Sequence, residues 1–264
     1  MSIHYGLDDH VAVITIDRPE KRNALDLLHW FDLAASWRRF RDDADAWVAV
    51  ITGVDESFCA GADLKTFIPL VTEALKNGVT EVDGMPIDCT LEATLRNLAV
   101  YKPIIAAVNG PCVAGGMELL GGTDIRIASE RASFGVMEPK RGIVAGGGTT
   151  SRLPRQLSWP AAMEILLTAD VFGPDRALEL GLLNEVVPHG DLGERAMWWA
   201  RRIAQNAPLA TAATKESALR GLQSSYQRAL ELETEIAQRV QVSNDATEGV
   251  NAFVEKREAR WTGT

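Results

Sequence analysis

The chain has 264 residues, of which 46% are hydrophobic and 24% charged, and this length suffices for one large globular core or two small ones. Its formal net charge of −9, with no basic stripe interleaved with aromatic residues, argues against nucleic-acid binding. No apolar stretch in the sequence is long enough to span a membrane, and the three cysteines match no metal-ligand spacing. We therefore expect a soluble, cytoplasmic protein with reduced cysteines and no metal site.

Strand and helix signals alternate through roughly the first half of the chain. Asn23 is predicted to cap one helix, and Asp63 is predicted to cap another that begins at Leu64. A glycine-rich bend at 142–148 leads into a short helix at 149–157. Predicted strands occupy residues 11–16, 47–52, 104–108 and 124–128. This alternation predicts an α/β fold.

After residue 190 only helical periodicity remains. Pro208 stands at a predicted helix start, as proline often does. The predicted helices span 192–205, 208–222, 225–242 and 247–257. Because amphipathic helices must bury their apolar faces, these helices are expected to cap the rest of the chain or to form an assembly surface. We therefore divide the chain into a strand-bearing region, 1–190, and a carboxyl-terminal helical region, 191–264.

Two turns made of small residues could offer backbone N–H groups to a substrate. One contains Ala60, Gly61 and Ala62, and the other ends at Gly115 and Gly116. Both lie between a predicted strand and a predicted helix. We expect the N–H groups of Ala60 and Gly115 to converge as an oxyanion hole, in which each donor contributes about 3–4 kcal/mol to transition-state stabilisation. Taken alone, each turn is better explained as a tight strand-to-helix connection.

Two glutamates follow these features. Glu118 lies in the first turn of the helix that Gly115 and Gly116 open, where a capping role would explain it equally well. Glu138 follows the apolar run 132–137 and precedes Pro139. An apolar setting raises the pKa of a carboxyl group and makes it a usable acid or base. Together, the glutamates and the turns suit proton transfer beside a polarised carbonyl.

In this order and spacing, the segments resemble the crotonase, or enoyl-CoA hydratase/isomerase, superfamily. The resemblance extends from about Val11 to Trp261. Besides the two turns and the two glutamates, it rests on Arg18-Pro19, Asn23-Ala24-Leu25, Lys102-Pro103, Asn109-Gly110, Asp124, Phe134-Gly135, Gly142, Gly146-Gly147 and Arg152-Leu153-Pro154. It implies a spiral of repeated ββα units, with carboxyl-terminal helices that assemble the chain into a trimer or a hexamer of paired trimers.

The resemblance also implies a chemistry. The N–H groups of Ala60 and Gly115 would hold the thioester carbonyl of an acyl-CoA, Glu118 would activate a water that adds at C3, and Glu138 would exchange a proton at C2. Isomerases of the superfamily commonly keep only the later glutamate, so the presence of both favours hydration of a 2-trans-enoyl-CoA. An isomerase, another acyl-CoA lyase or hydrolase, and a non-catalytic CoA-binding homologue remain alternatives. Coenzyme A is part of the substrate, and no separate cofactor is expected.

The residues that bind the rest of the substrate follow from the same resemblance. Those expected to contact coenzyme A or to border the site are Arg22, Ala24, Ala62, Asp63, Leu64, Lys65, Gly116, Phe253 and Lys256. Phe253 and Lys256 would reach a coenzyme A, often that of a neighbouring subunit, and a helical charge pattern would explain them equally well. For the basic residues, a solvated surface charge is an equally good explanation. Candidates for an acyl channel in the segment 66–95 are Phe67, Ile68, Leu70, Val71, Met85 and Ile87.

Overall fold

A six-stranded sheet organises the chain, as seen in a computed structural model that describes residues 2–264. β1 and β2 form an antiparallel hairpin, and every other pair of neighbouring strands is parallel. In spatial order the strands are β1 (Ile3–Asp8), β2 (Val11–Ile16), β3 (Val48–Gly53), β6 (Ile104–Val108), β8 (Ile125–Ser129) and β10 (Glu185–Val187). All five residues of β6 are buried, as expected for a parallel strand covered on both faces.

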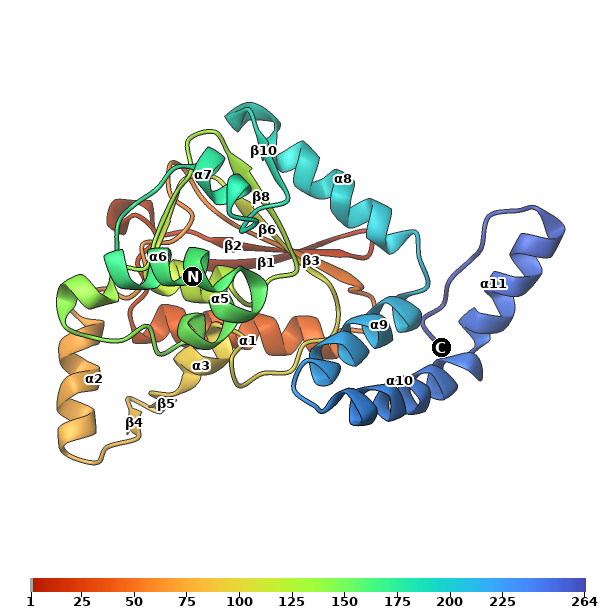
Figure 1. Ribbon diagram of the computed structural model, residues 1–264, viewed down its shortest axis with the longest axis horizontal. Helices are drawn as coiled ribbons and strands as arrows, with labels where there is room; N and C mark the ends of the chain where they lie inside the picture. Colours follow the sequence, from red (N-terminus) through yellow and green to blue (C-terminus); the bar gives the residue numbers. More distant parts are fainter. Residues whose placement is uncertain (1) are drawn as a thin grey trace.

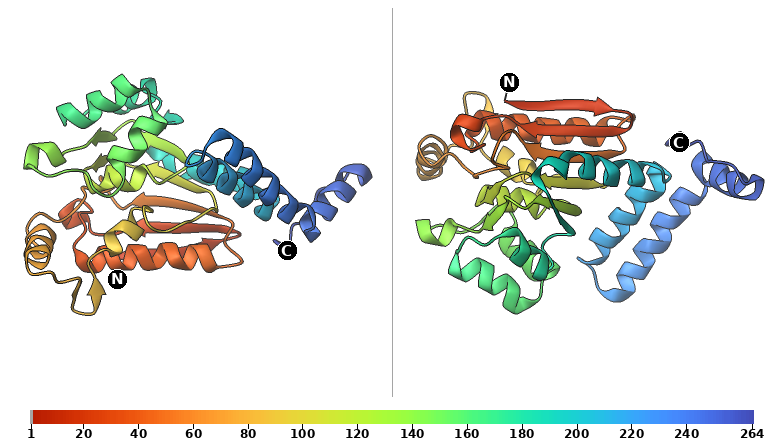
Figure 2. Two further views of the ribbon diagram at one scale, coloured as in Figure 1. Left: turned by 60° about the horizontal axis from the view of Figure 1, so that its bottom comes forward. Right: turned by 90° about the horizontal axis from the view of Figure 1, so that it is seen from above.

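Helices cover both faces of this sheet. Alternate strand residues point to opposite faces, so Ile51 belongs to one core and Val50 to the other. On the first face lies α1 (Leu27–Asp42), whose Trp37 and Phe40 are fully buried. On the second face lies α8 (Leu192–Ala204), and Figures 1 and 2 show it running along the strands. The predicted α/β class is confirmed.

The remaining helices of the carboxyl-terminal region leave the sheet. α9 (Pro208–Gly221) and α10 (Tyr226–Gln241) pack on each other, and α11 (Asn244–Glu255) extends away from the body of the molecule (Figures 1 and 2). All four predicted carboxyl-terminal helices are present, with ends within three residues of the predicted ones. α8 packs on the sheet and therefore belongs with the sheet layer. The division of the chain at residue 190 stays a prediction.

Shorter elements occupy the connections between the strands of the sheet and the link from β10 to α8. They are the 3₁₀ turns Pro19–Lys21, η2 (Glu138–Arg141) and His189–Asp191, the strands β4 (Glu81–Val82), β5 (Met85–Pro86), β7 (Pro111–Val113) and β9 (Ser133–Gly135), and the helices α2 (Phe67–Lys76), α3 (Cys89–Ala93), α4 (Gly115–Leu120), α5 (Thr149–Gln156), α6 (Trp159–Thr168) and α7 (Pro174–Glu179). Among residues 2–264, no helix combines the length and the apolar character that crossing a membrane requires.

One predicted helix cap is wrong. Asn23 has a φ of 57° and lies before α1, and its side-chain amide donates to the carbonyl oxygens of Val54 and Ser57, at 3.1 and 2.6 Å. Its amide therefore binds the loop after β3. The cap of α1 is Asp26, whose carboxylate accepts the N–H of His29.

Asp63 does act as an acceptor for backbone N–H groups, but not at the predicted helix start. Its carboxylate accepts the N–H groups of Lys65 and Thr66, and α2 begins at Phe67. The carboxylate also lies 3.2 Å from the guanidinium of Arg18. Burial works against ionisation of Asp63, but these hydrogen bonds and the charge of Arg18 hold its pKa below the usual value.

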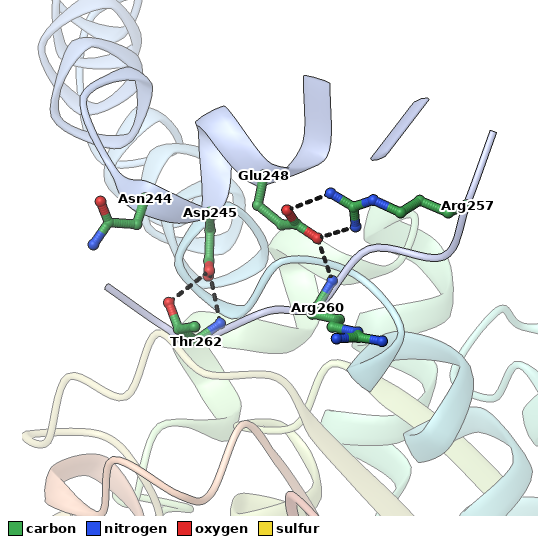
Figure 3. Close-up of a pocket in the computed structure, with 6 residues that line it drawn as sticks. All are labelled: Asn244, Asp245, Glu248, Arg257, Arg260 and Thr262. Atoms are coloured by element: carbon green, nitrogen blue, oxygen red, sulfur yellow. Dashed lines mark hydrogen bonds and ion pairs between the residues drawn. The ribbon is translucent and has the colours of Figure 1, made fainter. Parts of the chain in front are cut away.

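The chain after α11 folds back against that helix (Figure 3). Asp245, which is 2% exposed, accepts the N–H groups of Thr262 and Gly263. Glu248 forms two hydrogen bonds with the guanidinium of Arg257. These carboxylates line a small polar hollow, and because residues of the same chain already saturate them, we assign the hollow a structural role.

Candidate active site

Three parallel segments form a small layer beside the main sheet and bring the predicted site together. β7 pairs in parallel with β9, and Cys59 forms a parallel bridge with Cys112 of β7. Parallel segments end at a common edge, so the residues that follow them emerge side by side. Those residues are 60–63, 114–118 and 136–138, which contain both turns and both glutamates.

A cavity of about 660 Å³ opens where these segments meet. Its wall also includes residues of α2 and of the glycine-rich bend. Of the predicted residues, Ala60, Ala62, Leu64, Phe67, Ile68, Val71, Gly115, Glu118 and Glu138 line it. Leu70, Met85 and Ile87, which were predicted for an acyl channel, are not among the lining residues.

Gly61 and Gly115 allow the two turns to touch. A Cβ atom at Gly61 would lie 2.6 Å from the nitrogen of Gly115, and the φ of Gly61 is +85°, a conformation that L residues rarely adopt. A Cβ atom at Gly115 would lie 3.1 Å from the ring of Trp30. The close approach of the two backbones therefore requires glycine at Gly61, and a side chain at Gly115 would crowd Trp30 and the Cα atom of Gly61, 3.2 Å away.

The predicted donor Ala60 has to be corrected. Its N–H donates to the carbonyl oxygen of Arg22 at 3.2 Å, so it is already engaged within the chain. The N–H of Leu25 donates to the carbonyl oxygen of Gly61, and the carbonyl oxygen of Leu25 accepts the N–H of Asp63. In this parallel bridge the backbone N–H of the intervening Ala62 points away from Leu25. Throughout residues 2–264, no hydrogen-bond acceptor is assigned to the N–H of Ala62.

The second predicted donor is the N–H of Gly115. Gly115 is the first residue of α4, and the first N–H groups of a helix have no partner within the helix. In the described part of the chain its N–H, like that of Ala62, has no assigned acceptor. Both residues line the cavity. The pair of donors that the structure offers to a carbonyl oxygen is therefore Ala62 and Gly115.

Glu138 begins η2 directly after the β9 segment. It is 7% exposed, and its Oε2 atom is buried without a hydrogen-bond partner within residues 2–264. Burial, reinforced by the nearby charge of Glu118, raises the pKa of Glu138 to about 7. Near neutral pH this group can therefore both give and take a proton.

Glu118 projects from the first turn of α4. Its Oε1 atom accepts the N–H of Gly147, which belongs to the glycine-rich bend. A Cβ atom at Gly147 would lie 2.5 Å from Oε2, so this contact requires glycine. Burial raises the pKa of Glu118, and the hydrogen bond from Gly147 and the charges of Arg152 and Arg96 oppose that rise. The sequence showed a run of glycines but not which of them meets the carboxylate.

Several predicted substrate contacts lie outside the cavity wall. They are Arg22, Ala24, Asp63, Lys65, Gly116, Phe253 and Lys256. Asp63 is occupied by its internal contacts. A Cβ atom at Gly116 would lie 2.3 Å from the carbonyl oxygen of Cys59, so Gly116 serves the packing of α4. Phe253 belongs to α11 and Lys256 directly follows it; α11 lies at the end of the molecule far from α2 (Figures 1 and 2). Their role toward a neighbouring subunit stays a prediction.

No group of three or more histidine, cysteine, aspartate and glutamate side chains that could hold a metal ion gathers within residues 2–264. Cys59, Cys89 and Cys112 are free and buried, and burial raises the pKa of the Cys59 thiol to about 12. The expectation that the reaction uses neither a metal nor a separate cofactor stays a prediction.

The cavity holds the buried carboxyl group of Glu138, the half-buried one of Glu118 and two N–H groups without an assigned acceptor in residues 2–264. This combination defines an enzyme that moves protons beside a carbonyl group. The chain belongs to the enoyl-CoA hydratase/isomerase family, whose model matches residues 6–264. It is 37% identical over the full length of both chains to an (E)-benzylidenesuccinyl-CoA hydratase of Thauera aromatica. It is 36% identical to a short-chain-enoyl-CoA hydratase of Clostridium acetobutylicum, over 94% of this chain and 92% of the relative.

Solved structures agree with this assignment. An enoyl-CoA hydratase from Mycobacterium tuberculosis superposes with a TM-score of 0.87 at 38% identity, covering 100% of this chain and 99% of that one. An enoyl-CoA hydratase from Bacillus anthracis superposes with a TM-score of 0.90 at 31% identity, covering all of both chains. The predicted crotonase-type fold is confirmed.

Proposed function

We propose that this protein is an enoyl-CoA hydratase, a hydro-lyase that adds water reversibly to a 2-trans-enoyl-CoA and gives a 3-hydroxyacyl-CoA. The observation that carries this proposal is the meeting of Glu118 and Glu138 in one cavity with the N–H donors of Ala62 and Gly115. Relatives named as hydratases, 36–37% identical along nearly the whole chain, support the same reaction.

The arrangement assigns a role to each group. The N–H groups of Ala62 and Gly115 stabilise the negative charge that develops on the thioester oxygen. Glu118 accepts a proton from water while the water oxygen bonds to C3. The C2–C3 π electrons then take a proton from the neutral form of Glu138 at C2. Glu118 ends protonated and Glu138 ionised, and exchange of one proton with solvent restores both.

The remaining expectations belong to this proposal. Arg22, Ala24 and Lys65 would contact coenzyme A outside the cavity, and Phe253 and Lys256 would reach the coenzyme A of a neighbouring subunit in a trimer or hexamer. The apolar residues exposed on α11 support such an assembly. Three free cysteines suit the reducing cytoplasm, where we place the enzyme.

Hydration of crotonyl-CoA, followed by the loss of the ultraviolet absorbance of the enoyl thioester, tests the reaction. We expect Glu118→Gln and Glu138→Gln each to lower kcat by about a hundredfold or more. Glu179→Gln, at an exposed position on α7, is the matched control and should leave the rate unchanged. Double-bond migration in a 3-enoyl-CoA without hydration of any 2-enoyl-CoA would identify an isomerase instead.

A further inference from the structure

Two arginines line the otherwise mostly apolar cavity, and the hydration chemistry does not use either of them. Arg96 comes from the loop after α3, and Arg141 is the last residue of η2. The hydrogen bonds they donate go to the backbone carbonyls of Gly146 and Lys140, respectively. Within residues 2–264, neither guanidinium forms an ion pair with a carboxylate. The fold thus brings two exposed positive charges, neither held in an ion pair within the described residues, to the lining of the cavity.

Arg96 lies close to Glu118, the residue proposed to act at C3 of the substrate. Its Nη1 atom lies 2.5 Å from the carbonyl oxygen of Gly146, and the next residue, Gly147, donates its N–H to Glu118. Burial raises the pKa of Glu118, and the charge of Arg96 is among the influences that lower it, as expected for neighbouring groups. In the proposed reaction Glu118 serves C3. Arg96 therefore lies close to the group that serves C3, where it would meet an acyl group that continues beyond C3.

An alkyl chain is a poor occupant for that side. Packing methylene groups against a guanidinium removes water from a charge without replacing its hydrogen bonds. A guanidinium has five N–H donors, and Arg96 uses one of them on Gly146. A carboxylate matches the remaining donors and can pair with two at once. Because the chain has a net charge of −9, an anionic acyl group needs such a local cation.

We propose, on the basis of the hydratase function above, that Arg96, assisted by Arg141, selects enoyl-CoA substrates whose acyl group carries a carboxylate beyond C3. Arg96 then has two contacts: it fastens the glycine-rich bend through Gly146, and it binds the acyl carboxylate. The experiment has to separate these contacts. A further contact to be separated is one with the phosphates of coenzyme A.

Two probes of equal chain length separate them. Trans-2-hexenoyl-CoA and its counterpart with a terminal carboxylate in place of the methyl group share the same coenzyme A, so contacts with the phosphates cancel in the ratio of their kcat/KM values. We expect the wild type to prefer the carboxylated probe. Arg96→Gln should lower that preference about tenfold to a hundredfold, mainly through KM of the carboxylated probe. Arg141→Gln should lower it less.

Conservative and control variants complete the design. Arg96→Lys keeps the charge but not the planar fork, and should retain part of the preference. Arg155→Gln is the matched control, because Arg155 also donates to a backbone carbonyl, that of Ser151, but lies outside the cavity wall. It should leave the ratio unchanged.

Two outcomes would overturn the proposal. An equal loss on both probes in Arg96→Gln would assign Arg96 only to the bend or to coenzyme A, and a wild type that prefers the neutral probe would exclude selection for a carboxylate. Calorimetric binding of hexanoyl-CoA and adipoyl-CoA measures the same selectivity without turnover. A protein that hydrates neither probe but binds adipoyl-CoA more tightly through Arg96 would refute the hydratase function and keep the selectivity.

Discussion

At the scale of single residues, Glu138 has the clearest signature of function. Carboxylates are rarely buried in protein interiors unless they are paired. Glu138 nevertheless has a buried oxygen without a hydrogen-bond partner in the described structure. Its pKa is raised to about 7, chiefly by burial. A group of this kind is costly to the fold and useful to a reaction.

We predict that the rates of hydration and dehydration change in opposite ways as the pH rises. Hydration needs Glu138 in its neutral form, so kcat/KM for hydration should fall as the pH rises through about 7. Dehydration needs the ionised form and should become faster over the same range. Rate profiles measured with crotonyl-CoA and 3-hydroxybutyryl-CoA check this. In Glu138→Gln the ionisation should be absent from the residual activity, and a profile unchanged by the substitution would reassign the ionisation to another group.

The same raised pKa predicts an effect on stability. Between the ordinary glutamate pKa of about 4.5 and about 7, the folded chain binds more protons at Glu138 than the unfolded chain, so the contribution of this group to stability is lost as the pH rises. Full ionisation costs about 3 kcal/mol. Glu138→Gln should therefore be more stable than the wild type at pH 8, with the difference shrinking toward pH 4. Urea unfolding at both pH values measures it, and an equal difference at both would contradict it.

Residue-scale prediction from the sequence succeeded where local context was sufficient. The apolar run before Glu138 predicted a buried carboxyl, and Glu138 is buried. The choice between Ala60 and Ala62 failed, because both residues flank Gly61 and their side chains are identical. Only the pairing with Arg22 and Leu25 shows which N–H is occupied. That pairing joins distant parts of the chain and leaves no local mark.

At the scale of elements, the layer formed by Cys59, β7 and β9 fixes the site. Each catalytic segment extends only a few residues beyond it. Short extensions from paired backbone have little freedom to move, which is what an oxyanion hole needs in order to act without reorganisation. Gly61 and Gly115 come into close contact where two of these segments meet.

We predict that Gly61→Ala disables the site. The new Cβ would collide with the nitrogen of Gly115 at 2.6 Å and would also strain a φ of +85°. Separating the two donors should lower kcat by about a hundredfold or more, the cost of losing one oxyanion donor. Gly181→Ala is the matched control, because Gly181 has a φ of +80° and open space around it. It carries the strain without the collision. If both variants lost activity equally, strain alone would be the cause.

Element boundaries show what the sequence pattern missed. The start of α1 was misplaced because the side chain of Asn23, taken as a helix cap, instead donates to the carbonyl oxygens of Val54 and Ser57. β1 was not predicted, although Ile3, Tyr5 and Leu7 alternate with other residues as a half-buried strand does. That signal was present but short. The strands 11–16 and 104–108 were predicted with correct bounds, because they are long apolar runs.

At the scale of the whole molecule, the chain is a compact body with a helical arm. α11 presents apolar residues to solvent, of which Val250, Phe253 and Val254 are 65, 86 and 73% exposed. Their spacing of three and four places them on one helical face. A face of this kind is unfavourable in a monomer, which is why we propose that a second copy covers it.

We predict that Phe253→Asp shifts the protein toward monomers. A carboxylate buried in an apolar contact between copies should weaken the assembly by several kcal/mol. Light scattering after size-exclusion chromatography measures the mass. Leu167→Asp is the control, since Leu167 is 73% exposed on α6 and belongs to a different surface. A wild type that is monomeric at all concentrations would remove the basis of this prediction.

The segment between β3 and β6, which contains α2 and the hairpin of β4 and β5, bears on how enzymes of this family can acquire new substrates. α2 and the hairpin of β4 and β5 extend from the body (Figure 1), and α2 supplies Phe67, Ile68 and Val71 to the cavity wall. Both glutamates and the donor Gly115 arise later in the chain, from the layer. The part that shapes the acyl group can therefore be exchanged while the part that performs the chemistry stays in place. A recombined chain with another relative's residues 66–95 should accept different acyl groups and keep its proton-transfer machinery.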